Sequence, residues 1–397
     1  MHRHRKFRHF SSIAATLVGL WLDPASIVRA AESRVVQVGP THSLKTPSMA
    51  AAQAKDGDTI EIDAGDYPSD VAVWSANHLT LRGVRGMAHL AANGNSAQKK
   101  AIWVIRGNDT VVESVEFSGC KVPDRNGAGI RQEGRGLVVR HCCFHGNENG
   151  ILTGANPESD ILIENSEFHH SGFGDGYSHN LYIGQVRSFT MRFCSSHHAK
   201  TGHLVKSRAQ SNFILYNRLM DEQDGSSSYV IDLPNGGRSF IIGNILQHGP
   251  RAENGTMVSY AAEGPKNTVQ ELYVVNNTGI NERRPAGGFL KVSGNPATVR
   301  VVNNLVTGAA TLLSGSGETT QNLLTESPGF LDAAHYDYTL SASSPALHGG
   351  MDPGKAGDFG LTQEFYYHHP LAGVPFVKDG KPHLGACPAN KGASGPR

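Results

Sequence analysis

Residues that can move protons gather in one part of the chain, between residues 175 and 263. His203, Lys206 and Arg208 lie within six positions of one another, and Asp232 follows 26 residues after Lys206. A lysine or histidine can act as a general base, and a histidine or tyrosine can return a proton. An arginine supplies a fixed charge that stabilises a developing anion. We therefore take six residues as catalytic candidates: His179, Tyr182, His203, Lys206, Arg208 and Asp232.

This combination suits the removal of a proton from a carbon next to a carboxylate. Arg208 or Lys200 would neutralise the carboxylate and stabilise the enolate that forms. Lys206 and His203 compete for the role of base, because a neighbouring Asp232 would favour the charged lysine, whereas a histidine titrates near neutral pH. Tyr182 or His179 would protonate the leaving oxygen. The expected substrate-binding residues are Asn180, Lys200, Asn235, Tyr260 and Glu263.

A repeat positions these residues. An apolar alternation that ends in a small polar residue or Asn recurs every 24–33 residues, as in ILIENSEF (161–168) and FIIGNILQ (240–247). A second strand pattern, such as SHNLYIG (178–184) and TGHLVKS (201–207), interleaves with it. The period is too short for a propeller blade, which needs about 40 residues, and no helical pattern is present. The aligned positions of the first pattern are Ser114, His141, Asn165, Phe193, Asn217, Asn244, Asn277 and Asn304.

One coil of a parallel β-helix fits this repeat. Equivalent strands of successive coils then pair about 4.8 Å apart, and a buried Asn can bond to the Asn of the next coil. We align Leu181, Leu204 and Val230 as inward positions. This places Ile183, Lys206 and Asp232 in one column, with Lys206 and Asp232 on adjacent coils. The fold class is therefore all-β, a right-handed, single-stranded parallel β-helix.

The two ends differ from the repeat. Residues 1–30 have a basic start, a short apolar run and a small-residue cleavage site near Ala30, which is typical of a signal peptide and predicts a secreted or periplasmic protein. Residues 46–67 predict a helix, a turn and the first strand, with the helix capping the solenoid. We expect one β-helix domain over 31–350 and a partly disordered C-terminal extension over 351–397.

Composition excludes other classes. Glycine is frequent, at 46 of 397 residues, and charged residues are few, at 18%, as expected for short strands and tight turns. The net charge is +1, and it becomes −3 without residues 1–30, which hold five Lys or Arg and one Asp. A basic nucleic-acid-binding surface is therefore not expected. Residues 11–22 are too few to span a bilayer, which needs about 20 apolar residues, and no other stretch approaches that length.

Three sequence features resemble one known superfamily: GDTIEIDAGDY (57–67), the VNN repeats at 275–277 and 302–304, and PGFLDAAHYDYTLSASSPAL (328–347). They look like the pectate-lyase-like right-handed parallel β-helices, over roughly residues 40–350. The resemblance implies an enzyme acting on polysaccharides, and it implies that Lys or Arg bases and carboxylates bridged by Ca²⁺ are common. Here Asp221, Glu222 and Asp224, with Asp232, would supply calcium ligands.

We therefore expect a polysaccharide lyase that cleaves a uronate-containing polysaccharide by β-elimination. A glycoside hydrolase on the same fold is an alternative, with Asp232 and either Glu222 or Asp221 as its two carboxyl groups. A uronate C5-epimerase is another, since it uses the same proton abstraction. A glycan-binding solenoid without catalysis is disfavoured because the chain has only 3 Trp, one of them in the predicted signal peptide.

Overall fold

The computed structural model describes residues 34–376 and 380–390. The predicted signal peptide and the last residues of the predicted tail lie outside the described residues. Within the described part of the chain, no helix is long and apolar enough to cross a bilayer.

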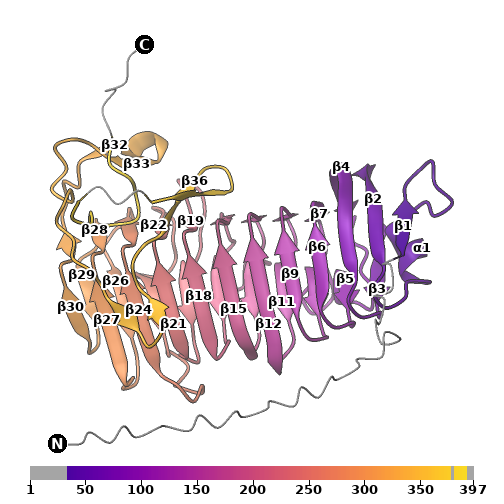
Figure 1. Ribbon diagram of the computed structural model, residues 1–397, viewed down its shortest axis with the longest axis horizontal. Helices are drawn as coiled ribbons and strands as arrows, with labels where there is room; N and C mark the ends of the chain where they lie inside the picture. The colour runs from indigo at the N-terminus through magenta and orange to yellow at the C-terminus, as the bar shows by residue number, and fades with distance from the viewer. Residues whose placement is uncertain (1–33, 377–379, 391–397) are drawn as a thin grey trace, which may run out of the picture. The chain divides into compact units, whose positions relative to one another are not determined.

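The body of the protein is a parallel β-helix whose coils contribute short strands to three stacks (Figure 1). In each coil the chain passes from stack 1 through a sharp bend into stack 2. A loop then leads into stack 3, and a turn leads back to stack 1. Within each stack, a strand pairs in parallel with the strand one coil before and one coil after it, as β15 (Val186–Arg192) does with β12 (Asn156–Glu164) and β18 (Ser211–Leu215). The predicted all-β solenoid is confirmed.

Stack 1 contains the strands β6 (Thr110–Glu113), β9 (Leu137–Arg140), β12, β15, β18, β21 (Arg238–Ile242), β24 (Glu271–Val275), β27 (Thr298–Val302) and β30 (Glu318–Thr320). Stack 2 contains β7 (Val115–Ser118), β10 (Cys143–His145), β13 (Glu167–His169), β16 (Ser195–His197), β19 (Arg218–Met220), β22 (Ile245–His248), β25 (Thr278–Asn281), β28 (Leu305–Thr307) and β31 (Leu323–Leu324). Stack 3 contains β3 (Ala72–Trp74), β5 (Ala101–Ile105), β8 (Ala128–Gln132), β11 (Asn149–Thr153), β14 (Leu181–Ile183), β17 (Val205–Ser207), β20 (Ile231–Leu233), β23 (Thr256–Tyr260), β26 (Gly288–Val292) and β29 (Thr311–Ser314).

The interior of the coils is apolar and ordered in columns, because every second residue of a strand points inward. The rings of Phe117, Phe144 and Phe168 stack on successive coils, with centroids 4.9 and 4.8 Å apart. Trp74 and Trp103 are fully buried at the start of this column. Since both tryptophans of the described chain lie in the core, neither is available to a surface groove.

Buried asparagines line the bend between stacks 1 and 2. Asn217, Asn244, Asn277 and Asn304 are fully buried, and the backbone N–H of each of the first three donates to the side-chain oxygen of the next. The predicted asparagine column is confirmed for these four coils, and Asn322 extends it.

In the first four coils the predicted alignment of the asparagine column is wrong by one residue, because the inward position is the residue after the one we aligned. Ser114, His141, Asn165 and Phe193 have positive φ and occupy the outer corner of the bend. The inward positions that follow them include Cys142, Ser166 and Cys194, and the side-chain oxygen of Asn217 accepts from the backbone N–H of Cys194.

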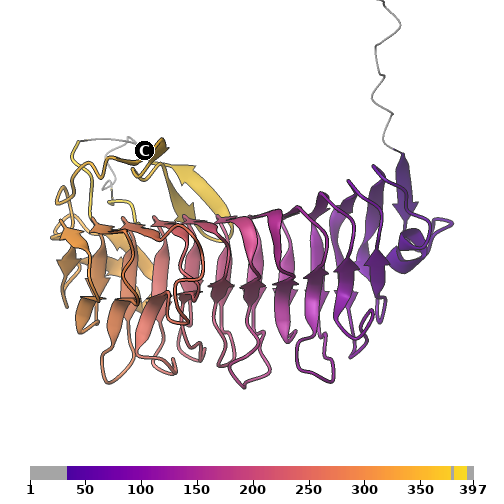
Figure 2. The ribbon, with the colours of Figure 1, turned by 90° about the horizontal axis from the view of Figure 1, so that it is seen from below.

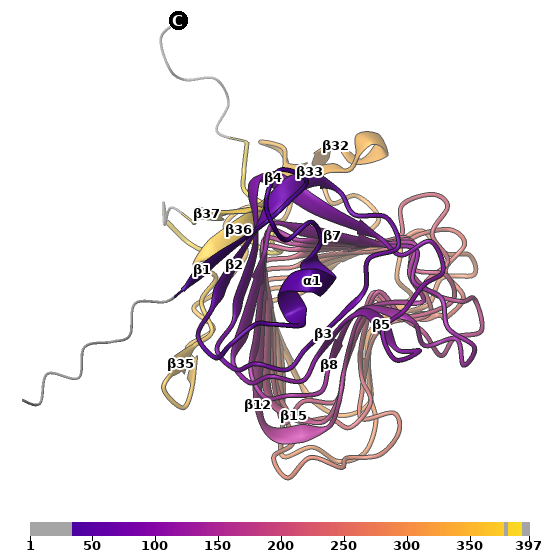
Figure 3. The same ribbon diagram turned by 90° about the vertical axis from the view of Figure 1, so that its right-hand side faces the viewer.

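The N-terminal end of the solenoid is closed by a short helix, α1 (Pro47–Ala51), which lies over the coil interior in Figure 3. Ala50 is fully buried in the core, and α1 contacts β1 (Val35–Val38) and β3. The predicted cap is therefore present, but β1, not the strand after the helix, is the first strand. β1 is followed by β2 (Thr59–Asp66) and by β4 (Thr80–Ala91), which pairs with both β6 and β7.

The chain after β31 leaves the solenoid and packs on its outer surface. Rings of Phe213, Phe240 and Tyr273 stack along the outside of stack 1, and Phe359 covers Phe240 at 4.4 Å between centroids. Loops project from the coils on the side away from these C-terminal strands (Figure 2). The elements of this region are β32 (Phe330–Asp332), η2 (Ala333–His335), β33 (Asp337–Leu340), β34 (Lys355–Ala356), β35 (Phe359–Gly360), β36 (Phe365–His368) and β37 (Ala372–Pro375).

Candidate active site

One column of outward residues on stack 3 carries the polar cluster. The strand register pairs Tyr182 with Lys206, Lys206 with Asp232, and Asp232 with Ser259. Lys206 and Asp232 therefore lie on adjacent coils, as predicted. The predicted position of Ile183 in this column is wrong, because Ile183 pairs with the buried Ser207 and lies in the core.

A network of ion pairs joins the column to the turns that lead back to stack 1. Lys206 Nζ lies 3.3 Å from Asp232 Oδ2 and 3.4 Å from Glu263 Oε1. Arg208 Nη2 lies 2.8 Å from Glu263 Oε2. The side chains of Lys206 and Asp232 are only 11% and 4% exposed, whereas that of Glu263 is 43% exposed. The pair Lys206–Asp232 thus forms the floor of the cluster, and Glu263 lies at its rim.

Arg208 is held by further hydrogen bonds. Its Nε donates to the Tyr182 hydroxyl at 2.9 Å, and its Nη1 donates to Asn235 Oδ1 at 2.7 Å. The side-chain amide of Asn267 donates to the carbonyls of Ala209 and Gly236, so it ties together the turns of two coils next to Arg208. The guanidinium is therefore fixed in orientation, with its charge directed to the rim.

Burial and charge act in opposite directions on the two carboxyl groups. Burial raises the pKa of Asp232, although the charge of Lys206 opposes this rise. Burial would also raise the pKa of Glu263, but the hydrogen bond from Arg208 and the charges of Lys206 and Arg208 outweigh it, so the pKa of Glu263 is lowered. Two neighbouring carboxyl groups with oppositely shifted pKa values are a feature of acid–base sites.

The two predicted histidines lie behind the cluster as a stacked pair, with centroids 4.5 Å apart. His179 Nδ1 accepts the backbone N–H of His203, and His203 Nδ1 accepts that of Tyr229. In the neutral ring the proton of His203 is then on Nε2, which lies 3.5 Å from Asp232 Oδ2. Burial lowers the pKa of His203 to about 3 and that of His179 well below its usual value. His203 therefore has no free lone pair at neutral pH, and its Nε2–H lies next to Asp232.

Three of the predicted substrate-binding residues lie away from the cluster. Asn180 is fully buried, and its amide donates to the carbonyl of His197 at 2.8 Å. Tyr260 points inward, and its hydroxyl donates to the carbonyl of Gly237 at 2.7 Å. Lys200 is exposed in the loop before stack 3, where its backbone bridges to Ser226. The structure brings together the predicted residues Tyr182, His203, Lys206, Arg208, Asp232, Asn235 and Glu263.

The predicted calcium ligands do not converge on one point. Asp221 is fully buried, where burial raises its pKa to about 6, and it accepts hydrogen bonds from Ser227. Glu222 accepts from Arg218, and Asp224 accepts from His198. Among the described residues, no cluster of potential metal ligands contains two of these three carboxylates. They do not fit a calcium cage, and Asp221 is too buried to serve as the second carboxyl group of a hydrolase.

A second set of histidines lies outside this site and is not among the predicted site residues. His–His doublets occur at 169–170 and 197–198, each at the end of a stack 2 strand. Their identical place in the repeat, 28 residues apart, was the signal that could have identified them.

One comparison with known structures supports this architecture. No protein-family model matches the sequence, and no curated protein matches it. The structure of the pectate lyase Pel9A superposes with a TM-score of 0.60 at 12% identity, covering 90% of this chain and 97% of that one. The fold is that of the pectate-lyase-like β-helices. A PL6 family polysaccharide lyase from Pseudopedobacter saltans matches with a TM-score of 0.38 at 14% identity, over 72% of this chain and 92% of that one.

Proposed function

We propose that this protein is an exported polysaccharide lyase that cleaves a uronate-containing polysaccharide by β-elimination. The observation that carries the proposal is the partly buried cluster in which a lysine, an arginine and a tyrosine lie together on stack 3. Lys206 is the base, Arg208 binds the uronate carboxylate, and Tyr182 is the acid. The Pel9A likeness supports the fold on which this site is built, and the chemistry rests on the residues.

Arg208 neutralises the substrate carboxylate. Its Nη2 is bonded to Glu263, the most exposed member of the network. A uronate carboxylate can replace Glu263 in a paired hydrogen bond to the guanidinium, because the two carboxylates have the same shape and charge. The neutralised uronate then has a more acidic C5–H, and the fixed cation stabilises the enolate as it forms.

Lys206 takes the C5 proton. It must first give up its own proton, and two carboxylates lie within reach, Asp232 at 3.3 Å and Glu263 at 3.4 Å. Asp232 is the better acceptor, because burial raises its pKa, whereas the pKa of Glu263 is lowered. His203 is disfavoured as base because backbone Tyr229 occupies its Nδ1 and its Nε2 faces Asp232.

Tyr182 completes the elimination. Its oxygen accepts the hydrogen bond from Arg208 Nε, so its own O–H is free to donate. The C5–H bond breaks toward Lys206, the electron pair forms the C4=C5 double bond, and the C4–O4 bond breaks. Tyr182 supplies the proton to O4. His179 is 1% exposed and is therefore a poor alternative acid.

A hydrolase is the second candidate, and the opposite pKa shifts of Asp232 and Glu263 favour it. Asp232 would be the acid and Glu263 the base. We rank it second because Asp232 lies beneath Lys206, with 4% of its side chain exposed.

The experiment is to incubate the mature protein with a panel of uronate polysaccharides and to follow two signals. Elimination raises the ultraviolet absorbance of the new C4=C5 bond, whereas hydrolysis releases reducing ends without that absorbance. The proposal requires the first signal and its loss in Tyr182→Phe. New reducing ends without absorbance would replace it with the hydrolase.

A further inference from the structure

A second group of ionisable side chains lies outside the candidate active site, on the outer face of stack 2. His145, His169 and His197 occupy the same register position on three successive coils. Their rings are stacked, with centroids 5.0 Å apart in each neighbouring pair. His170 and His198 follow next in the chain and stack at 4.8 Å. The imidazoles therefore form two parallel rows at the corner where the chain leaves stack 2.

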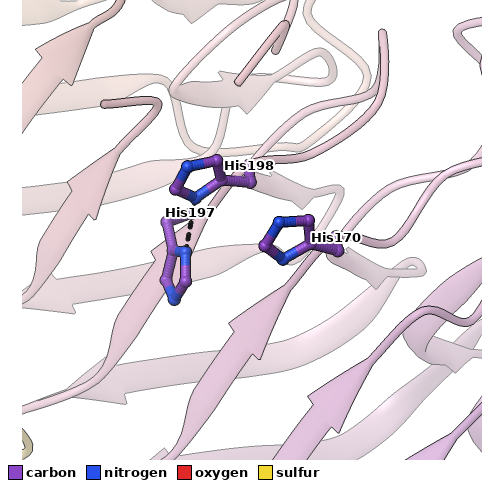
Figure 4. Close-up of side chains that lie close together, drawn as sticks. All are labelled: His170, His197 and His198. Atoms are coloured by element: carbon purple, nitrogen blue, oxygen red, sulfur yellow. Dashed lines mark hydrogen bonds between the residues drawn. The ribbon is translucent and has the colours of Figure 1, made fainter. Parts of the chain in front are cut away.

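Three of these rings converge (Figure 4). One ligand nitrogen of each of His170, His197 and His198 lies within 4.8 Å of the other two. The Nδ1 atoms of His197 and His198 are 2.6 Å apart. His170 is exposed, and the side chains of His197 and His198 are 15% and 12% exposed, so an ion from solvent can reach the group.

Carboxylates fix the outer nitrogens of two rings. His197 Nε2 lies 3.0 Å from Glu167 Oε1, and His198 Nε2 lies 2.8 Å from Asp224 Oδ1. A carboxylate accepts, so each Nε2 carries a proton and each Nδ1 presents a lone pair when the ring is neutral. Two facing lone pairs repel unless a cation lies between them, either one proton or a metal ion. Histidine ligands of metals commonly donate their other N–H to a carboxylate in this way.

We propose that His170, His197 and His198 bind a divalent transition-metal ion, with Zn²⁺ as the reference ion. Imidazole nitrogens suit zinc, copper and nickel, whereas Ca²⁺ and Mg²⁺ prefer oxygen. Three nitrogens leave one tetrahedral position for water. Zn–N bonds of about 2.0–2.1 Å require the Nδ1 atoms of His197 and His198 to move apart by a fraction of an ångström, through a small rotation of these two largely buried rings.

The site would join neighbouring coils. His170 follows β13, whereas His197 and His198 come at the end of β16, one coil later. A metal that binds only the folded chain stabilises it by mass action, so the melting temperature rises with metal concentration. At a free concentration about 100 times the Kd, we expect a rise of about 4 °C for a chain of this length.

The test is a titration of the metal-free mature protein with Zn²⁺, followed by calorimetry and by thermal melting. We expect one ion per chain, a rise in melting temperature with Zn²⁺ but not with Ca²⁺, and the visible d–d bands of tetrahedral Co²⁺ after substitution. His198→Gln should abolish all three signals. His145→Gln, from the same row but outside the triad, is the matched control and should retain them.

If the wild type does not bind Zn²⁺, the proposal is wrong. The cation between the Nδ1 atoms of His197 and His198 is then a shared proton. Binding that survives in His198→Gln but fails in His145→Gln would also overturn it, since the ion would then lie elsewhere in the row. If His198→Gln does not give the wild-type far-ultraviolet circular dichroism, His170→Gln replaces it, because His170 is the exposed ligand of the three.

Discussion

The contribution of the Lys206–Asp232 ion pair to stability can be measured separately from its contribution to turnover. Lys206→Met keeps the volume of the stem but leaves Asp232, with 4% of its side chain exposed, without its lysine partner, beside the neutral His203 and Ser259. Removing one partner of a buried pair costs about 3–5 kcal/mol. Asp232→Asn costs less, about 1–2 kcal/mol, because Lys206 retains its ion pair with Glu263 and the amide places no unpaired charge in the floor of the cluster.

The double variant Lys206→Met/Asp232→Asn leaves no buried charge unpaired. We expect it to be at least about 2 kcal/mol more stable than the sum of the single changes predicts. With an unfolding entropy of about 2.1 cal/mol/K per residue, a loss of 4 kcal/mol lowers the melting temperature of the body from Arg34 onward by about 5 °C. Thermal melting followed by circular dichroism measures all three variants.

The control is Lys291→Met, because Lys291 lies in the same outward column but is exposed. Its melting temperature should stay within about 1 °C of the wild type. Turnover should be lost in both variants that lack Lys206 and only reduced in Asp232→Asn. Additive stability changes, or turnover in the stable double variant, would refute the assignment of Lys206 as a buried, paired base.

Other residues give predictions of different kinds. Tyr182→Phe removes the phenolic hydroxyl, which is both the proposed acid and the acceptor of Arg208 Nε. We expect kcat to fall by about 10²–10⁴, and the melting temperature to fall by no more than about 2 °C for the lost hydrogen bond. A fall in kcat of less than tenfold would exclude Tyr182 as the acid. Asn277→Ala removes the oxygen that accepts hydrogen bonds from Asn244 N and Nδ2. It should lower the free energy of unfolding, measured in urea, by about 3 kcal/mol. A loss below about 1 kcal/mol would contradict a stabilising role of the asparagine column. Burial raises the pKa of Asp221 to about 6. Between about pH 4 and 6 the folded state therefore binds more protons than the unfolded state. The stability contributed by this carboxyl falls as the pH rises through that window. The free energy of unfolding of Asp221→Asn, relative to that of the wild type, should therefore rise by about 3 kcal/mol between pH 4 and pH 7. If the difference between the two proteins does not change with pH, Asp221 is not a buried carboxyl with a raised pKa.

The fold was predictable because an alternating apolar strand followed by an asparagine recurs at a regular spacing. Which bend residue points inward in the early coils was not predictable. The bend contains two consecutive residues, of which one has positive φ and faces outward and the other points into the core. Asn165 occupies the outer position, whereas Asn217 occupies the inner one. The Asn–Asn doublets at 276–277 and 303–304 occupy both positions, so residue type alone does not tell the outer position from the inner one.

The site was predictable in part for a similar reason. Lys206 and Asp232 hold the same place in successive repeats, and the pairing of their strands brings them together. Asn180 and Tyr260 have the polarity of site residues, but the alternation of side chains along the strands directs them inward. The contact of Glu263 with Lys206 comes from a turn two coils later, 57 residues along the chain, and no local pattern encodes it.

The central claim is that the cluster on stack 3 breaks a glycosidic bond by elimination. The most direct measurement is the mass of the oligosaccharides released from a uronate polysaccharide by the wild-type protein, with Lys206→Met/Asp232→Asn as the inactive control. We expect fragments one water lighter than hydrolysis products, with the unsaturated residue at the new non-reducing end, and none from the control. Fragments of hydrolytic mass, or unsaturated fragments from the control, would contradict it.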